Sequence, residues 1–284
     1  MINNLFLSVG AMKAGTTWLY ERLKDHPDVF FTPEKEIHYL ANKFGIENQL
    51  NHRNRLLKLK SIMSKYHNGN AKFILENISE IDWYVKYARA SKIDNDWYIS
   101  LFDELAGQKY CADFSNLYCQ MHNEAWANVS NISNNVKVIY TLRDPMKRLW
   151  SHYKFHHKWV GKEDSVLDDG FELFKSTLDK SWFYENANYA GNLRKVIAGV
   201  GEENVLVLYF EDFRTNPNAE AKKISNFLNI SPIVIPEESV QKKSNATKDF
   251  SMPNEWQAYA EKFLTGYIQD MQDMGLWHKS WVNI

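Results

Sequence analysis

The sequence predicts an α/β fold in which a parallel sheet is covered by helices on both faces. Short apolar segments rich in β-branched residues alternate along the chain with longer segments whose apolar residues recur at helical spacing. The 284 residues, 44% of them hydrophobic, are enough to bury a core without disulfides or metal ions. We therefore expect a single domain over residues 1–284, with a helical insertion at about 45–105.

The elements follow from local patterns. Strands are expected at 5–9, 109–112, 136–142 and 205–210. Helices are expected at 16–24, 51–66, 81–90, 96–106, 145–158, 186–200, 218–228 and 255–274. The first strand stops at Gly10, and the helix after the third strand opens with Pro145, in the favoured first-turn position.

Charge and cysteine content restrict the partners and the compartment. Lys and Arg number 34 against 35 Asp and Glu, so no global positive field attracts nucleic acid or an anionic membrane, and any anion site is local. Cys111 and Cys119 do not form a CxxC pair, so neither a zinc nor a redox motif is indicated. The opening residues 1–9 lack a basic leader and are too short to span a bilayer. We expect a cytoplasmic protein with no membrane span and no nucleic-acid partner.

The first strand leads through a glycine-containing loop, residues 10–17 (GAMKAGTT), into a helix. This setting places backbone N–H groups and a helix N-terminus on an anion. The glycines have Walker A spacing, but Thr16 stands where the Walker lysine belongs and Lys13 comes earlier. A lysine inside the loop can lean over a bridging oxygen that is about to become a leaving group. The alternative is an ordinary glycine turn with a surface lysine.

A second basic cluster follows the strand at 136–142. Arg143 stands at the carboxyl end of that strand, where open α/β sheets bind ligands, and Ser151 lies two turns into the next helix. An arginine fork and a hydroxyl suit a second phosphate. Arg148 is either part of this cluster or a core or surface ion-pair residue. Two anion sites at two strand ends suggest a nucleotide with two separate phosphate groups.

These motifs resemble those of the sulfotransferases. Residues 13–19 (KAGTTWL) resemble the 5′-phosphosulfate loop of that family, and Arg143-Asp144-Pro145 with Ser151 resembles its 3′-phosphate motif. Residues 35–40 (KEIHYL) resemble the segment that carries the catalytic glutamate in the heparan-sulfate-type branch and its bacterial relatives. The resemblance implies a P-loop-NTPase-like α/β fold and 3′-phosphoadenosine 5′-phosphosulfate (PAPS) as sulfuryl donor, with no metal.

The resemblance also implies roles for individual residues. Lys13 would contact the 5′-phosphate and the bridging oxygen, and Glu36 would be the base. His38 lies two residues after Glu36, so on an extended segment both would face the same side, and His38 would orient the acceptor or share its proton. The donor-binding set would be Lys13, Ala14, Gly15, Thr16, Thr17, Trp18, Arg143, Ser151 and Lys248. Lys248 is the nearest candidate for the late loop that covers the 3′-phosphate in the family. Phe114 stands where heparan-type enzymes carry a lysine, and Asn116 where a proline is common, so a basic contact to the acceptor is lost.

Other interpretations remain open at this point. A P-loop kinase that uses ATP and Mg²⁺ on a small molecule is the main alternative, although the position of Lys13 argues against it; a non-catalytic nucleotide-binding protein is a third. The acceptor could be a glycan, a lipid headgroup or a small metabolite, sulfated on a hydroxyl or an amine. The basic stretch 52–65 could rim an acceptor cleft or form a solvated helix face. The aromatic residues Trp83, Tyr84, Trp97 and Tyr98 could stack on an acceptor or pack in the core.

Overall fold

The sheet consists of five parallel strands in the order β2-β3-β1-β4-β5. The computed structural model describes residues 1–67, 69–168, 170–235 and 250–281. The strands are β1 (Ile2–Ser8), β2 (Val29–Phe31), β3 (Tyr110–Asp113), β4 (Ser133–Leu142) and β5 (Val205–Tyr209). The predicted α/β fold with a parallel sheet is confirmed, and the four expected strands are present. The edge strand β2 was not expected, because three residues are too few to show a period.

The central strand β1 lies between β3 and β4, with Leu5 opposite both Cys111 and Val136. Since all five strands are parallel, their carboxyl ends meet at one edge of the sheet. The chain leaves β1 toward β2 on one side and leaves β4 toward β5 on the other. Ligands of open α/β sheets bind at such a reversal, outside the carboxyl ends of the strands.

All eight expected helices are present, and the described residues contain six further helices that the periodicity did not predict. The helices are α1 (Thr16–Leu23), α2 (Tyr39–Lys43), α3 (His52–His67), α4 (Ala71–Glu76), α5 (Ile78–Arg89), α6 (Asn95–Ser100), α7 (Asn123–Ala127), α8 (Pro145–Trp159), α9 (Gly170–Leu178), α10 (Ser181–Tyr184), α11 (Tyr189–Val200), α12 (Phe210–Thr215), α13 (Pro217–Leu228) and α14 (Asn254–Asp273). Two expected helices are shorter than predicted. The one at 96–106 ends at Ser100, and the one at 186–200 begins only at Tyr189, where the side chain of Asn188 caps it by accepting from the Gly191 N–H.

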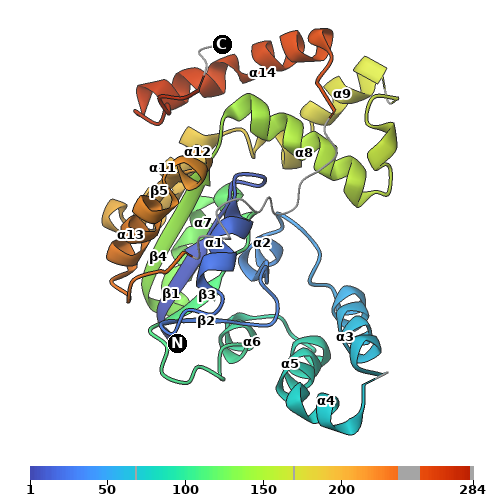
Figure 1. Ribbon diagram of the computed structural model, residues 1–284, viewed down its shortest axis with the longest axis vertical. Coiled ribbons are helices and arrows are strands. Elements are labelled where there is room, and N and C mark those ends of the chain that lie inside the picture. The colour runs from blue at the N-terminus through green and yellow to red at the C-terminus, as the bar shows by residue number, and fades with distance from the viewer. Residues whose placement is uncertain (68, 169, 236–249, 282–284) are drawn as a thin grey trace.

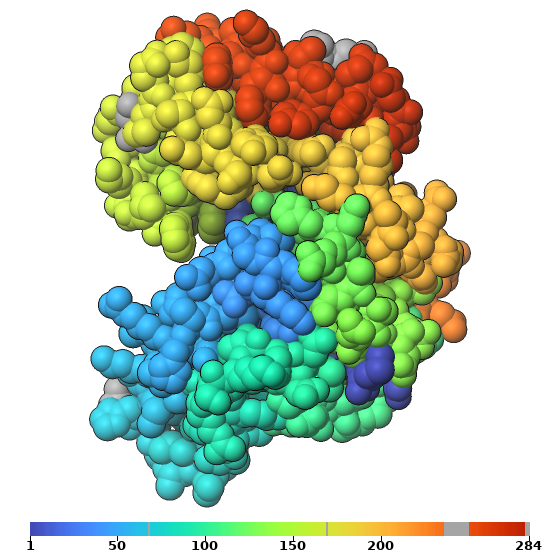
Figure 2. Space-filling model, turned by 180° about the vertical axis from the view of Figure 1, so that it is seen from behind, coloured from blue at the N-terminus to red at the C-terminus, as the bar shows by residue number. Residues whose placement is uncertain are grey.

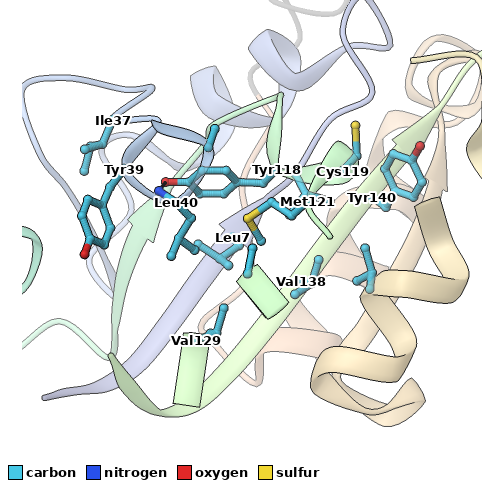
Figure 3. Close-up of a cluster of buried hydrophobic side chains, with 14 of the residues drawn as sticks. Leu7, Ile37, Tyr39, Leu40, Tyr118, Cys119, Met121, Val129, Val138 and Tyr140 are labelled. Atoms are coloured by element: carbon cyan, nitrogen blue, oxygen red, sulfur yellow. Dashed lines mark hydrogen bonds between the residues drawn. The ribbon is translucent and has the colours of Figure 1, made fainter. Parts of the chain in front are cut away.

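Side chains of β1 alternate between the two faces of the sheet. Leu5 and Leu7 join one buried cluster, with residues of α7 and α11, whereas Phe6 joins the other, with residues of α1 and α13. Figure 3 shows part of the first cluster, where Leu40 and Tyr118 lie near Leu7 beneath the carboxyl edge of the sheet. Helices therefore cover both faces. Four aromatic residues of the helical segment between β2 and β3 are also buried in the first cluster, which favours the core interpretation of Trp83, Tyr84, Trp97 and Tyr98.

A third buried cluster joins α8, α9 and α14 beyond the carboxyl ends of the strands (Figure 1). Phe174 of α9 stacks on Trp256 of α14 with ring centroids 4.7 Å apart, and Tyr153 of α8 packs edge-on against both. In the space-filling view, the surface is indented between this upper part and the body below it (Figure 2). The cluster holds α8 over the edge of the sheet where a ligand would lie.

Candidate active site

The loop after β1 makes a tight turn into α1. Lys13 and Gly15 both adopt positive φ angles, 68° and 99°, and a Cβ on Gly15 would lie 2.8 Å from the ring of Phe210. Glycine is therefore required at position 15 by conformation and by space. Gly15 caps α1 without a side-chain hydrogen bond, so the first amides of the helix, at Thr16 and Thr17, point out of its end. Such amides attract an anion.

Lys13 reaches from this turn toward α8. Its ammonium lies 4.4 Å from the centroid of the Phe155 ring, a cation–π contact. Burial lowers the pKa of Lys13 to about 8, and the positive charges of Arg143, Lys158 and Lys154 add to the effect. The whole chain has a net charge of −1, so an anion can be attracted only where positive charge is concentrated locally, as it is around this loop.

Arg143 brings the second motif to the same place. Its Nη1 donates to the main-chain oxygen of Lys13 at 3.0 Å, and its guanidinium stacks on Phe210 at 4.6 Å. Its Nε is buried and has no hydrogen-bond partner among the described residues. Burial lowers the pKa of Arg143, although Arg stays charged at neutral pH. An anion bound at this place would satisfy this donor.

The other residues of the two motifs are placed as follows. Ser151 lies on α8 one turn before Phe155, so both share the face of α8 that Lys13 touches. Trp18 stacks on Phe213 at 4.3 Å. Arg148 is completely buried beside His152, and its Nε and Nη2, like the Nε of Arg143, have no hydrogen-bond partner among the described residues. Lys248 lies outside the described residues.

Glu36 lies on the segment between β2 and α2. Its Oε2 accepts from Asn116 Nδ2 at 2.9 Å and lies 3.3 Å from His38 Nε2, while its Oε1 lies 3.5 Å from Lys35 Nζ. Burial alone would raise the pKa of Glu36, but the hydrogen bond from His38 and the charge of Lys35 outweigh it, so the pKa of this carboxyl is lowered. Glu36 is therefore an ionised carboxylate at neutral pH.

Asp113, the last residue of β3, holds this segment in place. Its Oδ1 accepts from the Ile37 N–H at 3.3 Å and from the Ser115 hydroxyl at 2.6 Å. Its Oδ2 accepts from the hydroxyls of Tyr98 and Tyr118, at 3.0 and 2.8 Å. Burial raises the pKa of this fully buried carboxyl, and the hydrogen bonds oppose that shift. Four donors on one buried carboxyl fix residues 36–38 relative to the sheet.

Asn116 connects the Glu36 segment to the loop after β1. Its main-chain oxygen lies so close to Gly10 that a Cβ there would be 2.5 Å from it, and its side-chain amide donates to Glu36. The segments after β1, β2 and β3 therefore converge at one point, and Arg143 adds the segment after β4. Each of the four strands ends at the same edge, which explains the convergence.

His38 is placed differently from the prediction. We expected an extended segment that directs Glu36 and His38 to the same side, but His38 has a φ of 58° and precedes α2. Its main-chain N–H donates to Ser115 Oγ at 2.8 Å, and the turn still brings its ring to Glu36.

Phe114 is fully buried against Phe6 and Phe31, so this position serves the core.

Sequence reasoning assigned no role to Asp113, Asn116 or Phe155. A signal existed for Asp113, because a carboxylate and a serine two residues apart at a strand end often mark a hydrogen-bonded turn. No group of three or more His, Cys, Asp or Glu side chains in the described ranges is arranged to hold a metal ion. Within those ranges, no helix is both long and apolar enough to cross a bilayer.

The arrangement combines an anion cradle with a nearby base. The cradle consists of the uncapped N-terminus of α1, the ammonium of Lys13 and the guanidinium of Arg143. The ionised carboxylate of Glu36 is joined to it through Asn116. Such a site can hold a phosphorylated donor and accept a proton from a second substrate.

Comparisons with known proteins agree with this geometry. The family model described as the sulfotransferase domain matches residues 4–265. Carbohydrate sulfotransferase 15 of Rattus norvegicus is 24% identical over 274 residues, covering 85% of this chain and 46% of the relative. The membrane-associated sulfotransferase kil1 of Dictyostelium discoideum is 27% identical over 168 residues, covering 59% of this chain and 26% of the relative. The chain thus spans less than half the length of these curated relatives.

Solved structures show the same fold at low sequence identity. A sulfotransferase from Alicyclobacillus acidocaldarius superposes with a TM-score of 0.64 at 19% identity, covering 96% of both chains. The sulfotransferase domain from the curacin biosynthetic pathway superposes with a TM-score of 0.54 at 15% identity, covering 97% of this chain and 98% of that one. Together with the family match over residues 4–265, these findings establish that the chain belongs to the sulfotransferase domain family.

Proposed function

We propose that this protein transfers the sulfuryl group of PAPS to a hydroxyl or an amine of an acceptor. The observation that carries the proposal is the hydrogen bond from Arg143 to the main-chain oxygen of Lys13, at 3.0 Å. It joins the two motifs, so that one ligand can bridge the loop after β1 and the segment after β4. A nucleotide with phosphates at both its 5′ and 3′ positions needs two such anion-binding segments close together.

The donor set is proposed residue by residue. The 5′-phosphosulfate binds the amides of residues 15–17 and the ammonium of Lys13, with Ala14 before them in the loop and Trp18 after them in the same helix start. The 3′-phosphate binds the guanidinium of Arg143 and the hydroxyl of Ser151. The buried, unpartnered Nε of Arg143 supports this role, since an anion would satisfy it.

In the proposed reaction, an oxygen or nitrogen atom of the acceptor attacks sulfur in line. The bond between sulfur and the bridging oxygen breaks, and adenosine 3′,5′-bisphosphate leaves. Lys13 and the amides at the start of α1 stabilise the negative charge that builds on the leaving oxygen. Glu36 accepts the acceptor's proton through Oε1, because Oε2 is engaged by Asn116 and His38. His38 and Asn116 keep Glu36 in position.

The chemical class of the acceptor is a separate part of the proposal. The carbohydrate sulfotransferases among the relatives favour a sugar hydroxyl, and a lipid headgroup or a small metabolite remains within the proposal. A cytoplasmic location is part of the proposal as well; the free, buried thiols of Cys111 and Cys119 support a reducing compartment.

Calorimetry with adenosine 3′,5′-bisphosphate tests donor binding, and sulfuryl transfer from ³⁵S-labelled PAPS to cell extracts tests the reaction. We expect micromolar binding without Mg²⁺ and a labelled product. Lys13→Ala and Glu36→Gln should each lower turnover by about 10² or more. An enzyme that binds ATP with Mg²⁺ and ignores the bisphosphate would be a kinase instead, and the proposal would fail.

A further inference from the structure

The outward face of α3 carries exposed apolar and cationic side chains side by side. The residues of this face recur every three or four positions and comprise Arg53, Leu56, Leu57, Lys60, Met63 and His67. Leu56, Leu57 and Met63 are 43%, 52% and 56% exposed. The opposite face of α3 packs inward through Arg55 and Tyr66, both buried. The exposed leucines therefore lie on the face that the core does not use.

The neighbouring helix α4 extends this exposed apolar area. None of its residues is buried, although its sequence is AKFILE. Phe73 is 42% exposed and Leu75 is 69% exposed, and Ile78 at the start of α5 is 45% exposed. We call the outward face of α3 together with Phe73, Leu75 and Ile78 the insertion surface. Figure 1 shows α3, α4 and α5 projecting from the body of the protein, at the end away from α14.

The charged side chains of α3 are all cationic, whereas α4 ends at Glu76, which pairs with Lys72. Residues 48–75 contain six Lys or Arg and no Asp or Glu, although the whole chain has a net charge of −1. Four of the six have partners. Arg55 donates to main-chain oxygens of Leu50 and Tyr87, and Lys58, Lys65 and Lys72 pair with Glu34, Glu80 and Glu76. Arg53 and Lys60 form no ion pair with any residue that the structure describes. On the outward face of α3, Arg53 lies one turn before Leu56 and Leu57, and Lys60 lies one turn after them.

We propose that the insertion surface binds the interfacial layer of a bilayer rich in anionic lipids, with α3 lying in the plane of that layer. The side chains of Leu56, Leu57 and Met63 are transferred from water to the boundary of the acyl chains. The cationic groups of Arg53 and Lys60 bind lipid phosphates. A polyanionic polysaccharide would engage the cations but leave the apolar side chains in water. A second copy of the chain would bring like charges together.

The insertion surface is tied to the segment that carries Glu36. Lys58, on the inner side of α3, pairs with Glu34, and the Tyr84 hydroxyl of α5 donates to the other oxygen of the same carboxylate at 2.7 Å. Glu34 stands two residues before Glu36. A bilayer bound at α3 would therefore lie at a defined distance from the candidate active site.

Vesicle co-sedimentation of the whole chain tests the proposal. We use vesicles of phosphatidylcholine alone and vesicles that also contain about 30% phosphatidylglycerol. The protein should sediment with the anionic vesicles only. Leu57→Ser combined with Leu75→Ser, and Arg53→Glu combined with Lys60→Glu, should each lower the partition coefficient by about tenfold or more.

Matched controls separate the surface from general effects. Leu173→Ser on α9 and Lys222→Glu on α13 change exposed residues elsewhere and should leave partitioning unchanged. Affinity for adenosine 3′,5′-bisphosphate and the unfolding temperature report folding of each variant independently of the bilayer. Vesicle binding that the two double variants do not weaken would overturn the proposal. Binding only to an anionic polysaccharide, or a dimer that the serine variant dissociates without any vesicle binding, would overturn it as well.

Discussion

Arg143 Nη1 donates to the main-chain oxygen of Lys13 at 3.0 Å, so the arginine that follows β4 holds the turn that follows β1. The same guanidinium stacks on Phe210, whose ring also excludes a side chain at position 15. One planar group thus supports the loop and lies at the proposed donor site.

The first prediction concerns the shape of that group. Arg143→Lys keeps the charge but loses the fork and the stacking. We expect it to weaken binding of adenosine 3′,5′-bisphosphate by about 30- to 100-fold, measured by calorimetry. Arg214→Lys on the exposed side of α12 is the matched control and should bind normally. Wild-type affinity in Arg143→Lys would show that the charge alone suffices.

The second prediction concerns the pH dependence of donor binding. The pKa of Lys13 in the free protein is about 8, and the anionic ligand binds the ammonium form. Affinity for the bisphosphate should be nearly constant between about pH 7 and 8, where its phosphates are ionised, and fall by up to about tenfold per pH unit above pH 8. Calorimetry across this range measures the fall. Lys13→Arg stays charged and should bind with a flatter profile; an equally steep fall in that variant would assign the titration to another group.

The third prediction separates stability from binding at Lys13. Because the pKa of Lys13 is lowered on folding from 10.5 to about 8, the ammonium destabilises the folded state fully below pH 8, and this effect disappears as the pH rises toward 10.5. Lys13→Met should therefore raise the unfolding temperature at pH 7 by about 2–5 °C. The gain should shrink at pH 10, while bisphosphate binding is lost at both pH values. A lower unfolding temperature at pH 7 would contradict the burial cost.

The sequence predicted the parts of the site that depend on neighbouring residues. The loop of Lys13 and the strand end at Arg143 are continuous motifs, and the parallel sheet required their strands to end at one edge. For Asp113 only part of the information is local: its partners at positions 115 and 118 are near in sequence, whereas those at positions 37 and 98 meet it only in the folded chain. His38 was expected in extended backbone, since nothing in its neighbours marks a left-handed residue.

Short elements were missed for a related reason. The strand β2 and the helix α4 have three and six residues, fewer than a periodic pattern needs. Packing decides their conformation: β2 pairs with β3, and Phe73 of α4 contacts the ring of Tyr66 in α3. The tertiary context therefore supplies information that the local sequence does not contain.

The fourth prediction tests Asp113 as a positioning residue. Asp113→Asn replaces one of the two acceptor oxygens with an amide group that donates, so two of the four donors on this side chain lose their acceptor. We expect the free energy of unfolding to fall by about 2–4 kcal/mol and kcat to fall more than bisphosphate affinity. Tyr98→Phe removes one donor only and should cost about 1 kcal/mol. Unchanged kcat in folded Asp113→Asn would show that residues 36–38 do not need this anchor.

The fifth prediction concerns the proton acceptor. Glu36→Gln preserves the shape of the side chain and removes its basicity, so kcat should fall by about 10² or more while bisphosphate affinity stays within about twofold of wild type. His38→Ala and Asn116→Ala remove the two groups that hold Oε2 and should lower kcat by about tenfold each. The pKa of Glu36 is lowered, so the wild-type rate should not decline through this group between pH 7 and about 5. Sulfuryl transfer from labelled PAPS measures all four enzymes. Full activity in Glu36→Gln would contradict the role of Glu36 as base and assign that role to His38, whose ring would then act on the acceptor directly. The double variant Glu36→Gln/His38→Ala tests whether the two residues act together. If it loses no more activity than His38→Ala alone, the two residues act as one unit.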